Sequence, residues 1–444
     1  MGQMHPLLSV ELVRKVSSPT RENEGRGFFG CNKSRAQFMI QDAQLEGKIQ
    51  KLWSYCQAND WAGYDPYDAT NSKIFAALPF LNAKIPRLVL TQALKRTPLN
   101  FRRLLRIPKT QNPKAIALFL SAFLRLERNG VAKAEDLVEP LIGRLVALRS
   151  KGVRHWCWGY SFPWQTRTIV VPSGAPNLVC TTFVGNALLD AYEQRLDRQC
   201  LSMAMEAAQY ILDELYWTDG KSVAGFSYPL PGLKNQVPNA NFLGAALLCR
   251  VYRHTSEGRF IDPALRVARC SAAQQRADGS WDYGEGPSQR WIDNFHTGYN
   301  LCALRSIGRY AGTTEFESSI RSGLEFYQAH FFREDGAPRY FHNRTYPVDI
   351  HCVAQSIITL LALKDLEPNN VEFARAVFQW AMNHMWDERG FFYYRVLRFC
   401  TIRIPYMRWA QAWMLLAMST LLCESDALVR SPETSDTGAL IEAL

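Results

Sequence analysis

Two pairs of titratable side chains stand where apolar helical patterns begin. Asp293 and His296 are three residues apart, so they share one face of a helix. Asp349 and His351 are two apart and point to different sides of a helix, so only one of them need face a shared site. Because histidine is the side chain most easily poised for proton transfer near neutral pH, we predict that these four residues are catalytic.

Polar and aromatic residues gather at the starts of other apolar helical patterns and in the loops before them. Helix N-termini offer unpaired N–H groups and a positive dipole end, which favour anionic or hydroxyl-rich ligands. Aromatic loop residues offer flat surfaces on which sugar rings stack. The predicted substrate-binding residues are Asp65, Asp68, Asn71, Trp158, Asn177, Asn239, Trp281, Tyr283, Asn294, Tyr346, Tyr406, Arg408 and Trp409.

Several of these residues also have a purely structural interpretation. Asp349 either caps a helix or forms a buried ion pair with Arg403 or Arg408. Part of the loop aromatics only seal the packing between helices. The asparagines that can simply cap helices are Asn177, Asn239 and Asn294.

The carboxylates allow glycosidic cleavage, in which one carboxyl group is the acid and another the base or nucleophile. A metal site is poorly supported, because the ligand types in Asp349-Ile350-His351-Cys352 are adjacent and cannot all reach one ion. The sequence has no CxxC, HExxH, P-loop or GxSxG motif, so we expect no metal and no cofactor. The candidate acids are Asp65, Asp68, Asp282, Glu285, Asp293 and Asp349.

These residues lie within a sequence repeat, in which an amphipathic segment is followed by a Gly/aromatic loop and then by a more apolar segment. The aromatic residues Trp158, Tyr228, Tyr283, Tyr340 and Phe392 mark successive loops, spaced by 70, 55, 57 and 52 residues. That spacing suits a helical hairpin with its loops, and stacked hairpins share one core. We therefore predict an all-α fold, an (α/α)6 toroid with apolar helices inside and amphipathic helices outside.

The apolar periodicity is helical almost throughout, with no convincing strand ladder, although Phe391–Tyr394 could form a short β segment. Asp262-Pro263, and Thr314 with Glu317, are predicted helix starts. We predict a single domain over 35–430, with disordered segments at 1–34 and 431–444. The predicted helices cover 40–57, 72–82, 87–97, 113–129, 135–150, 177–195, 198–216, 239–254, 263–275, 293–310, 315–331, 348–364, 370–386 and 406–423, two of them merged or outside the ring.

The chain carries a net charge of +10, and basic residues are dense in Lys95–Arg106. That segment is a solvated helix face, or it attracts a phosphate, an acidic glycan or an anionic membrane. Nucleic acid is not an expected partner, because no binding motif accompanies the charge. No signal peptide and no apolar run long enough to span a bilayer is apparent, and the 11 cysteines form no disulfide framework, so we expect a cytoplasmic protein.

Two resemblances to known families add to this interpretation. Gln275-x-x-x-Gly279-x-Trp281 is similar to the QW repeat of the squalene cyclase and prenyltransferase toroids, but the DxDD acid motif and the zinc ligand set of those families are absent. More of the chain resembles VpsJ-like bacterial proteins of surface-polysaccharide gene clusters. The stretches concerned are Gly63–Asp68, Asn112–Lys114, Pro176–Val179, Asp293–Gly298, Asp349–His351 and Arg408–Trp413.

The second resemblance implies a role in exopolysaccharide or lipopolysaccharide production. We therefore expect a protein that binds a glycan or glycolipid in a central cavity and acts on it by acid/base chemistry, as a hydrolase, lyase or epimerase. It would contact an anionic membrane or the biosynthetic machinery peripherally. The alternatives are a non-catalytic glycan-binding assembly factor and an isoprenoid-handling protein of the cyclase type.

Overall fold

The computed structural model describes residues 27–78, 83–131, 133–166 and 169–430. Two compact units divide the chain, Met1–Ala43 and Gln44–Leu444, and helix α1 (Gly27–Ala58) begins in the first unit and ends in the second. The disorder expected for 1–26 and 431–444 concerns residues outside the described ones. Residues 27–34, expected to be disordered too, belong to α1.

Among the described residues of the second unit, six apolar helices form a closed ring. Each packs against the next along the chain, and the last packs against the first. This closure confirms the predicted (α/α)6 toroid. The inner helices are α4 (Pro113–Arg128), α6 (Leu178–Arg195), α8 (Pro238–Thr255), α10 (Asn294–Ala311), α12 (Ile350–Ala362) and α14 (Ala412–Arg430).

Amphipathic helices form the outer layer. In α9, Phe260, Ala264, Val267 and Ser271 are buried, a spacing that places them on one helix face. The part of α1 that belongs to the second unit, from Gln44 to Ala58, takes the sixth outer position, where Trp53 packs edge-on against Phe123 of α4 with ring centroids 4.9 Å apart. The other outer helices are α5 (Val138–Ala147), α7 (Arg198–Tyr210), α9 (Gly258–Ala272), α11 (Glu317–His330) and α13 (Asn370–Met385).

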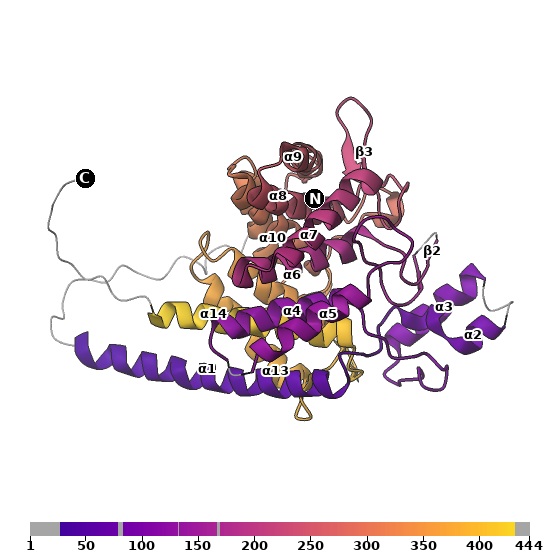
Figure 1. Ribbon diagram of the computed structural model, residues 1–444. Coiled ribbons are helices and arrows are strands. Elements are labelled where there is room, and N and C mark those ends of the chain that lie inside the picture. Colours follow the sequence, from indigo (N-terminus) through magenta and orange to yellow (C-terminus); the bar gives the residue numbers. More distant parts are fainter. Residues whose placement is uncertain (1–26, 79–82, 132, 167–168, 431–444) are drawn as a thin grey trace, which may run out of the picture. The chain divides into compact units, whose positions relative to one another are not determined.

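An insertion between α1 and α4 lies beside the ring, as predicted for two of the helices. It contains the 3-10 helix η1 (Asp68–Asn71), α2 (Lys73–Ala77) and α3 (Lys84–Arg96). In Figure 1, α2 and α3 project to one side of the inner helices. The remaining short helical turns are η3 (Glu135–Leu137), η4 (Ile211–Leu215), η5 (Pro287–Gln289) and η6 (Met407–Gln411).

Strands in the described residues are only two or three residues long and lie in the loops. They form small antiparallel sheets, β1–β2, β3–β4, β6–β7 and the three-stranded β5–β8–β9. The β segment expected in Phe391–Tyr394 is β7. The strands are β1 (Trp164–Gln165), β2 (Val170–Val171), β3 (Tyr216–Thr218), β4 (Ala224–Phe226), β5 (Val348–Asp349), β6 (Trp386–Asp387), β7 (Phe391–Phe392), β8 (Arg395–Val396) and β9 (Thr401–Ile402).

Two predicted helix starts are wrong. Asp262-Pro263 does not open a helix, because α9 begins at Gly258 and Pro263 lies inside its first turns. Thr314 does not cap α11, whose N-cap is Phe316 without a side-chain hydrogen bond. In both places the outer helix is fixed by the burial of its apolar face, which outweighs a local capping preference.

The QW-like segment has a structural use in this fold. The Gln275 side-chain amide donates to the carbonyls of Gly279 and Ser319, both at 2.9 Å. The Trp281 indole is buried and donates to the Ser271 carbonyl at 3.2 Å. The motif therefore ties the loop after α9 to α11.

No helix in the described part of the chain is long and apolar enough to cross a membrane.

Candidate active site

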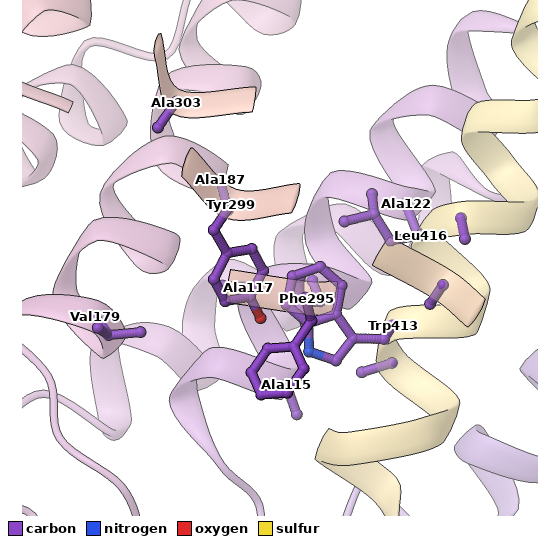
Figure 2. Close-up of a cluster of buried hydrophobic side chains, with 14 of the residues drawn as sticks. Ala115, Ala117, Ala122, Val179, Ala187, Phe295, Tyr299, Ala303, Trp413 and Leu416 are labelled. Atoms are coloured by element: carbon purple, nitrogen blue, oxygen red, sulfur yellow. The ribbon is translucent and has the colours of Figure 1, made fainter. Parts of the chain in front are cut away.

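Aromatic side chains fill the middle of the ring near the starts of the inner helices. Figure 2 shows Phe295 and Tyr299 of α10 meeting Trp413 of α14 between the inner helices. Tyr299 stacks on Trp413 with centroids 5.6 Å apart, and Phe295 meets Tyr299 edge-on at 5.9 Å. The expected wide central cavity is therefore largely occupied by rings, and polar groups are placed among them.

His351 lies at the centre of this aromatic cluster. Its ring centroid is 4.4 Å from that of Trp409, 4.6 Å from Trp413 and 4.7 Å from Phe295. Burial, and then the positive charge of Lys114, lower the pKa of His351 well below its usual value, so the imidazole is neutral. Its Nε2 atom lies 2.6 Å from the Tyr299 hydroxyl.

Lys114, in the first turn of α4, brings a buried ammonium group to the same cluster. Its Nζ atom is 3.5 Å from the Tyr299 hydroxyl and 4.0 Å from the centroid of the Phe183 ring. None of the described acidic residues forms an ion pair with it. Burial therefore lowers the pKa of Lys114 well below its usual value.

These contacts fix the direction of a short hydrogen-bond chain. Burial raises the pKa of Tyr299, so its phenol keeps its proton and donates it to His351 Nε2. The Tyr299 oxygen can then accept from Lys114. Since the neutral ring carries one proton, His351 holds it on Nδ1, which is buried and has no protein partner. The chain Lys114–Tyr299–His351 thus presents one unused N–H donor.

His296 forms a second acid/base group on α10. Its Nδ1 lies 2.8 Å from Asp293 Oδ2, which also accepts from the Trp291 indole at 3.0 Å. The other Asp293 oxygen caps α10 by accepting from the His296 backbone N–H at 3.0 Å. A carboxylate on Nδ1 leaves Nε2 as the accepting nitrogen, the arrangement that prepares a histidine as a general base.

A hollow of about 200 Å³ adjoins His296. Its wall includes Tyr283 and Trp291, whose rings stack with centroids 4.5 Å apart, and Tyr283 also contacts the His296 ring at 4.7 Å. Asn239, whose Oδ1 atom is buried without a protein partner, is a further lining residue. That figure includes space open to solvent, and the enclosed room is only about 10 Å³, far below the roughly 300–1,000 Å³ of usual ligand sites.

Asp349 is held by other groups and is not free to transfer a proton. It is fully buried, caps α12 through the His351 backbone N–H at 2.9 Å, and accepts from the Trp409 indole at 2.9 Å. Its second oxygen pairs with Arg395. The expected ion-pair partners Arg403 and Arg408 are therefore wrong, whereas the predicted cap is correct.

Asp65 and Asp68 are also paired with buried arginines. Arg408 donates to both oxygens of Asp65, at 2.7 and 2.8 Å. Arg102 does the same to Asp68, at 2.8 and 3.1 Å, and also donates to the Asp65 backbone carbonyl. These pairs join the inserted segment to η6 and leave neither carboxylate free.

Other predicted binding residues serve packing. The Trp158 indole is fully buried and donates to the Leu145 carbonyl at 2.8 Å. Tyr406 is fully buried beneath the Arg102 guanidinium, which is 4.7 Å from its ring centroid. Trp281 borders the hollow beside His296 but is only 2% exposed.

The last four predicted residues lie at or near helix starts. Asn177 caps α6 by accepting from the Cys180 backbone N–H at 2.9 Å. Asn294 is buried behind the site, where Tyr327 donates to it at 3.0 Å. Tyr346 is half-buried near Arg333, and Asn71 ends η1.

The sequence prediction missed Lys114, Tyr299 and Arg395. A lysine in the first turn opposes the helix dipole, so Lys114 at the start of a wholly apolar helix was a usable signal. Tyr299 stands three residues after His296 and shares its helix face, which was a second signal. Arg395 had none, because its partner lies 46 residues away and the pairing depends on the fold.

A surface hollow of about 680 Å³ lies on the outer helix α7 and contains His155. Both ring nitrogens of His155 are engaged, by Glu206 and Asp213, each at 3.0 Å. This histidine has no free nitrogen for proton transfer, so we place the active site at the inner helices. Among the described residues, no group of three His, Cys, Asp or Glu side chains could hold a metal ion.

Solved structures with the same fold are enzymes that act on carbohydrates. The chain is similar to cellobiose 2-epimerase from Bacillus thermoamylovorans, with a TM-score of 0.58 and 10% identity over 72% of this chain and 90% of that one. It is also similar to a family GH76 α-mannanase from Bacteroides thetaiotaomicron (TM-score 0.55, 11% identity, 72% and 87% covered) and to a D-mannose isomerase (TM-score 0.53, 11% identity, 70% and 86% covered). At these identities the similarity establishes the toroid fold. No protein-family model and no curated protein matches the sequence.

Proposed function

We propose that this protein is a sugar epimerase or isomerase that moves a proton next to the carbonyl carbon of a reducing sugar. The observation that carries the proposal is the pair of histidines on α10 and α12, His296 and His351, both with ring centroids 6.0 Å from that of Tyr299. One offers an accepting nitrogen and the other a donating one. The fold that it shares with sugar epimerases and isomerases supports the same reaction class.

In the proposed reaction, the open-chain sugar lies between the two imidazoles. His296 Nε2 removes the proton from C2, while His351 Nδ1–H donates to the carbonyl oxygen on which negative charge develops. Delivery of the His351 Nδ1 proton to the other face of C2, with Tyr299 and then Lys114 replacing that proton at Nε2, gives the epimer. Return of the proton from His296 to C1, with loss of the O2 hydroxyl proton as C2 becomes the carbonyl, gives the ketose. Asp293 is a positioning residue that holds His296 in the accepting tautomer.

Glycoside hydrolysis is the weaker alternative because it requires two available carboxyl groups. Asp65, Asp68 and Asp349 each pair with an arginine, and Asp293 accepts three hydrogen bonds. Burial raises the pKa of Asp68 to about 6 although Arg102 lowers it, but both of its oxygens already accept from Arg102.

The biological setting that we propose is bacterial surface-polysaccharide production in the cytoplasm, at or near the membrane. The resemblance to VpsJ-like proteins supports this setting. The substrate is then a glycan or glycolipid precursor with a reducing-end sugar.

The test is proton exchange in deuterated water with free mannose, glucose and cello-oligosaccharides as substrates. We expect deuterium at C2, together with an epimer or ketose product, in NMR spectra. His296→Gln and His351→Gln should each lower the rate by at least about 100-fold, and His384→Gln on the outer helix α13 should leave it unchanged. Release of a new reducing end without exchange would instead identify a hydrolase.

The second candidate is a non-catalytic glycan-binding assembly factor, which the small volume beside His296 favours. It predicts sugar binding by calorimetry with no exchange and no effect of either histidine substitution on any product. Binding of an isoprenoid phosphate in place of sugars would support the cyclase-type alternative.

A further inference from the structure

The insertion beside the ring exposes an unusual amount of apolar surface. Among the described residues, ten large hydrophobic side chains are exposed, and six of these lie between residues 78 and 104. Their exposed fractions reach 73% for Ile85 and 72% for Leu104. We call these six residues the apolar patch: Leu78, Ile85, Val89, Leu99, Phe101 and Leu104.

Helix α3 is amphipathic with its apolar residues on two faces. Thr91 and Leu94 are buried on one face of α3. Ile85 and Val89, four residues apart, are exposed on the opposite face. Arg96, eleven residues after Ile85, continues the same exposed stripe. The face that looks away from the protein is therefore apolar with a cationic end.

The sequence that carries the patch is basic, and the nearby Asp68 is paired with Arg102. From Ala69 to Leu126 the sequence contains no aspartate or glutamate. Lys84, Arg96, Arg103 and Arg106 are exposed within or beside the patch. Exposed apolar residues interspersed with exposed cations, in a segment without acidic residues, match an anionic lipid bilayer, in which apolar side chains enter the acyl boundary and Lys/Arg groups meet phosphate headgroups.

We propose that the exposed face of α3 and the turn at 99–106 form a docking surface for an anionic membrane. This proposal does not depend on the proposed reaction. Docking would hold the protein at the surface where lipid-linked sugars are found, with Ile85, Val89 and Leu104 inserted and the arginines at headgroup level.

The docking surface is attached directly to the candidate site. Arg102, between the exposed Phe101 and Arg103, pairs with Asp68 and reaches the Asp65 carbonyl. On α3, Lys95 turns inward and its Nζ lies 3.9 Å from the Tyr67 ring centroid. The Tyr67 ring is 5.3 Å from that of Trp409, which contacts His351, so the inserted segment is connected to the aromatic cluster around His351.

The test is cosedimentation of the full chain with vesicles. The probes are vesicles of phosphatidylglycerol and phosphatidylethanolamine in equal parts, and vesicles of phosphatidylcholine alone. We expect binding to the first and at least about tenfold weaker binding to the second, with further loss in high salt. Ile85→Asp with Leu104→Asp should lower binding to the anionic vesicles by at least about tenfold, and Arg96→Glu with Arg103→Glu should do the same.

Matched controls remove equivalent groups elsewhere. Phe399→Asp changes a residue that is 88% exposed but outside the patch, and Lys234→Glu changes an exposed cation in another loop. Both should bind like the unmodified chain. Equal binding to both vesicle types, or full binding by the patch variants, would overturn the proposal. The proposal would also be overturned if the chain formed a soluble dimer that does not bind vesicles and that Ile85→Asp converts to monomers. The patch would then be a protein interface.

Discussion

Replacing Lys114 by methionine is expected to make the protein more stable and less active. The ammonium of Lys114 is only 3% exposed and has no carboxylate partner among the described residues. Methionine has a similar length, no branch and no charge, so it fills the same space among Phe183, Tyr299 and Trp413. The substitution therefore removes a buried charge without opening a cavity.

The size of the gain follows from two opposing terms. The ammonium is 4.0, 5.1 and 5.3 Å from three ring centroids, and a desolvated cation–π contact such as the nearest one contributes about 2 kcal/mol. Removing an ion from water costs several kcal/mol, and replacing buried ions by apolar groups typically stabilises by about 1–4 kcal/mol. We expect about 2 kcal/mol, which corresponds to a rise in Tm of about 2 °C, because unfolding a chain of this length has an entropy of about 0.9 kcal/mol/K.

The stability difference between the two proteins should depend on pH. The folded-state pKa of Lys114 is lowered, so the unfolded chain binds the proton more tightly. The penalty is therefore complete at pH values below the folded pKa and declines as the pH rises toward the unfolded value of about 10.4. The advantage of Lys114→Met should shrink over that range.

Denaturant unfolding of both proteins from neutral to alkaline pH measures this difference. Lys109→Met is the control, because Lys109 is exposed and hydrogen-bonded to Asn59, and it should produce no pH-dependent gap. A less stable Lys114→Met protein, or an advantage that is the same at every pH, would refute the reasoning about an uncompensated buried cation.

Two further predictions concern the frame that holds the site. Asp65→Asn leaves Arg408 buried without its partner and should lower the free energy of unfolding by about 3–5 kcal/mol. The control Glu257→Gln removes one partner of an exposed pair and should change that free energy by less than about 1 kcal/mol. Thermal unfolding measures both changes. Gly279→Ala places a methyl group 2.2 Å from a backbone carbonyl at φ +87° and should cost about 2–3 kcal/mol. Gly143→Ala, in an uncrowded helix position, should instead stabilise by about 0.5–1 kcal/mol in the same measurement.

The fold could be predicted from the sequence because its signal is repeated and periodic. Apolar helices covered on both sides, such as α12, have a different sequence pattern from helices with one charged face, such as α9. Where the prediction failed, it relied on one local preference. Pro263 was predicted to start a helix. Because Phe260 and Ala264 are both buried on one face of α9, the helix begins before Pro263, at Gly258, and continues through it.

The site could be predicted only in part. The spacing of residues along one helix can be read from the sequence, but the ion pairs between distant segments depend on the fold. Asp293 and His296 are three residues apart and do form a hydrogen-bonded pair, as their spacing suggested. The pairing of Asp349 with Arg395, and of Asp65 with Arg408, joins segments distant in sequence. No spacing rule identifies such partners, so carboxylates that looked available are engaged.

The charge balance of the interior distinguishes between the reactions that remain. Arg102, Arg395 and Arg408 each have an aspartate partner, while the ammonium groups of Lys95 and Lys114 face aromatic rings with no ion-pair partner among the described residues. The starts of the inner helices add positive dipole ends. Glycosidic cleavage passes through a cationic, oxocarbenium-like state, which such an environment destabilises. Proton removal beside a carbonyl passes through an anion, which the same groups stabilise. Burial lowers the pKa of Lys95 to about 7 and that of Lys114 well below its usual value, so these groups act as cations only in their protonated forms. In those forms, together with the helix dipoles, they oppose hydrolysis and favour chemistry in which negative charge develops between His296 and His351.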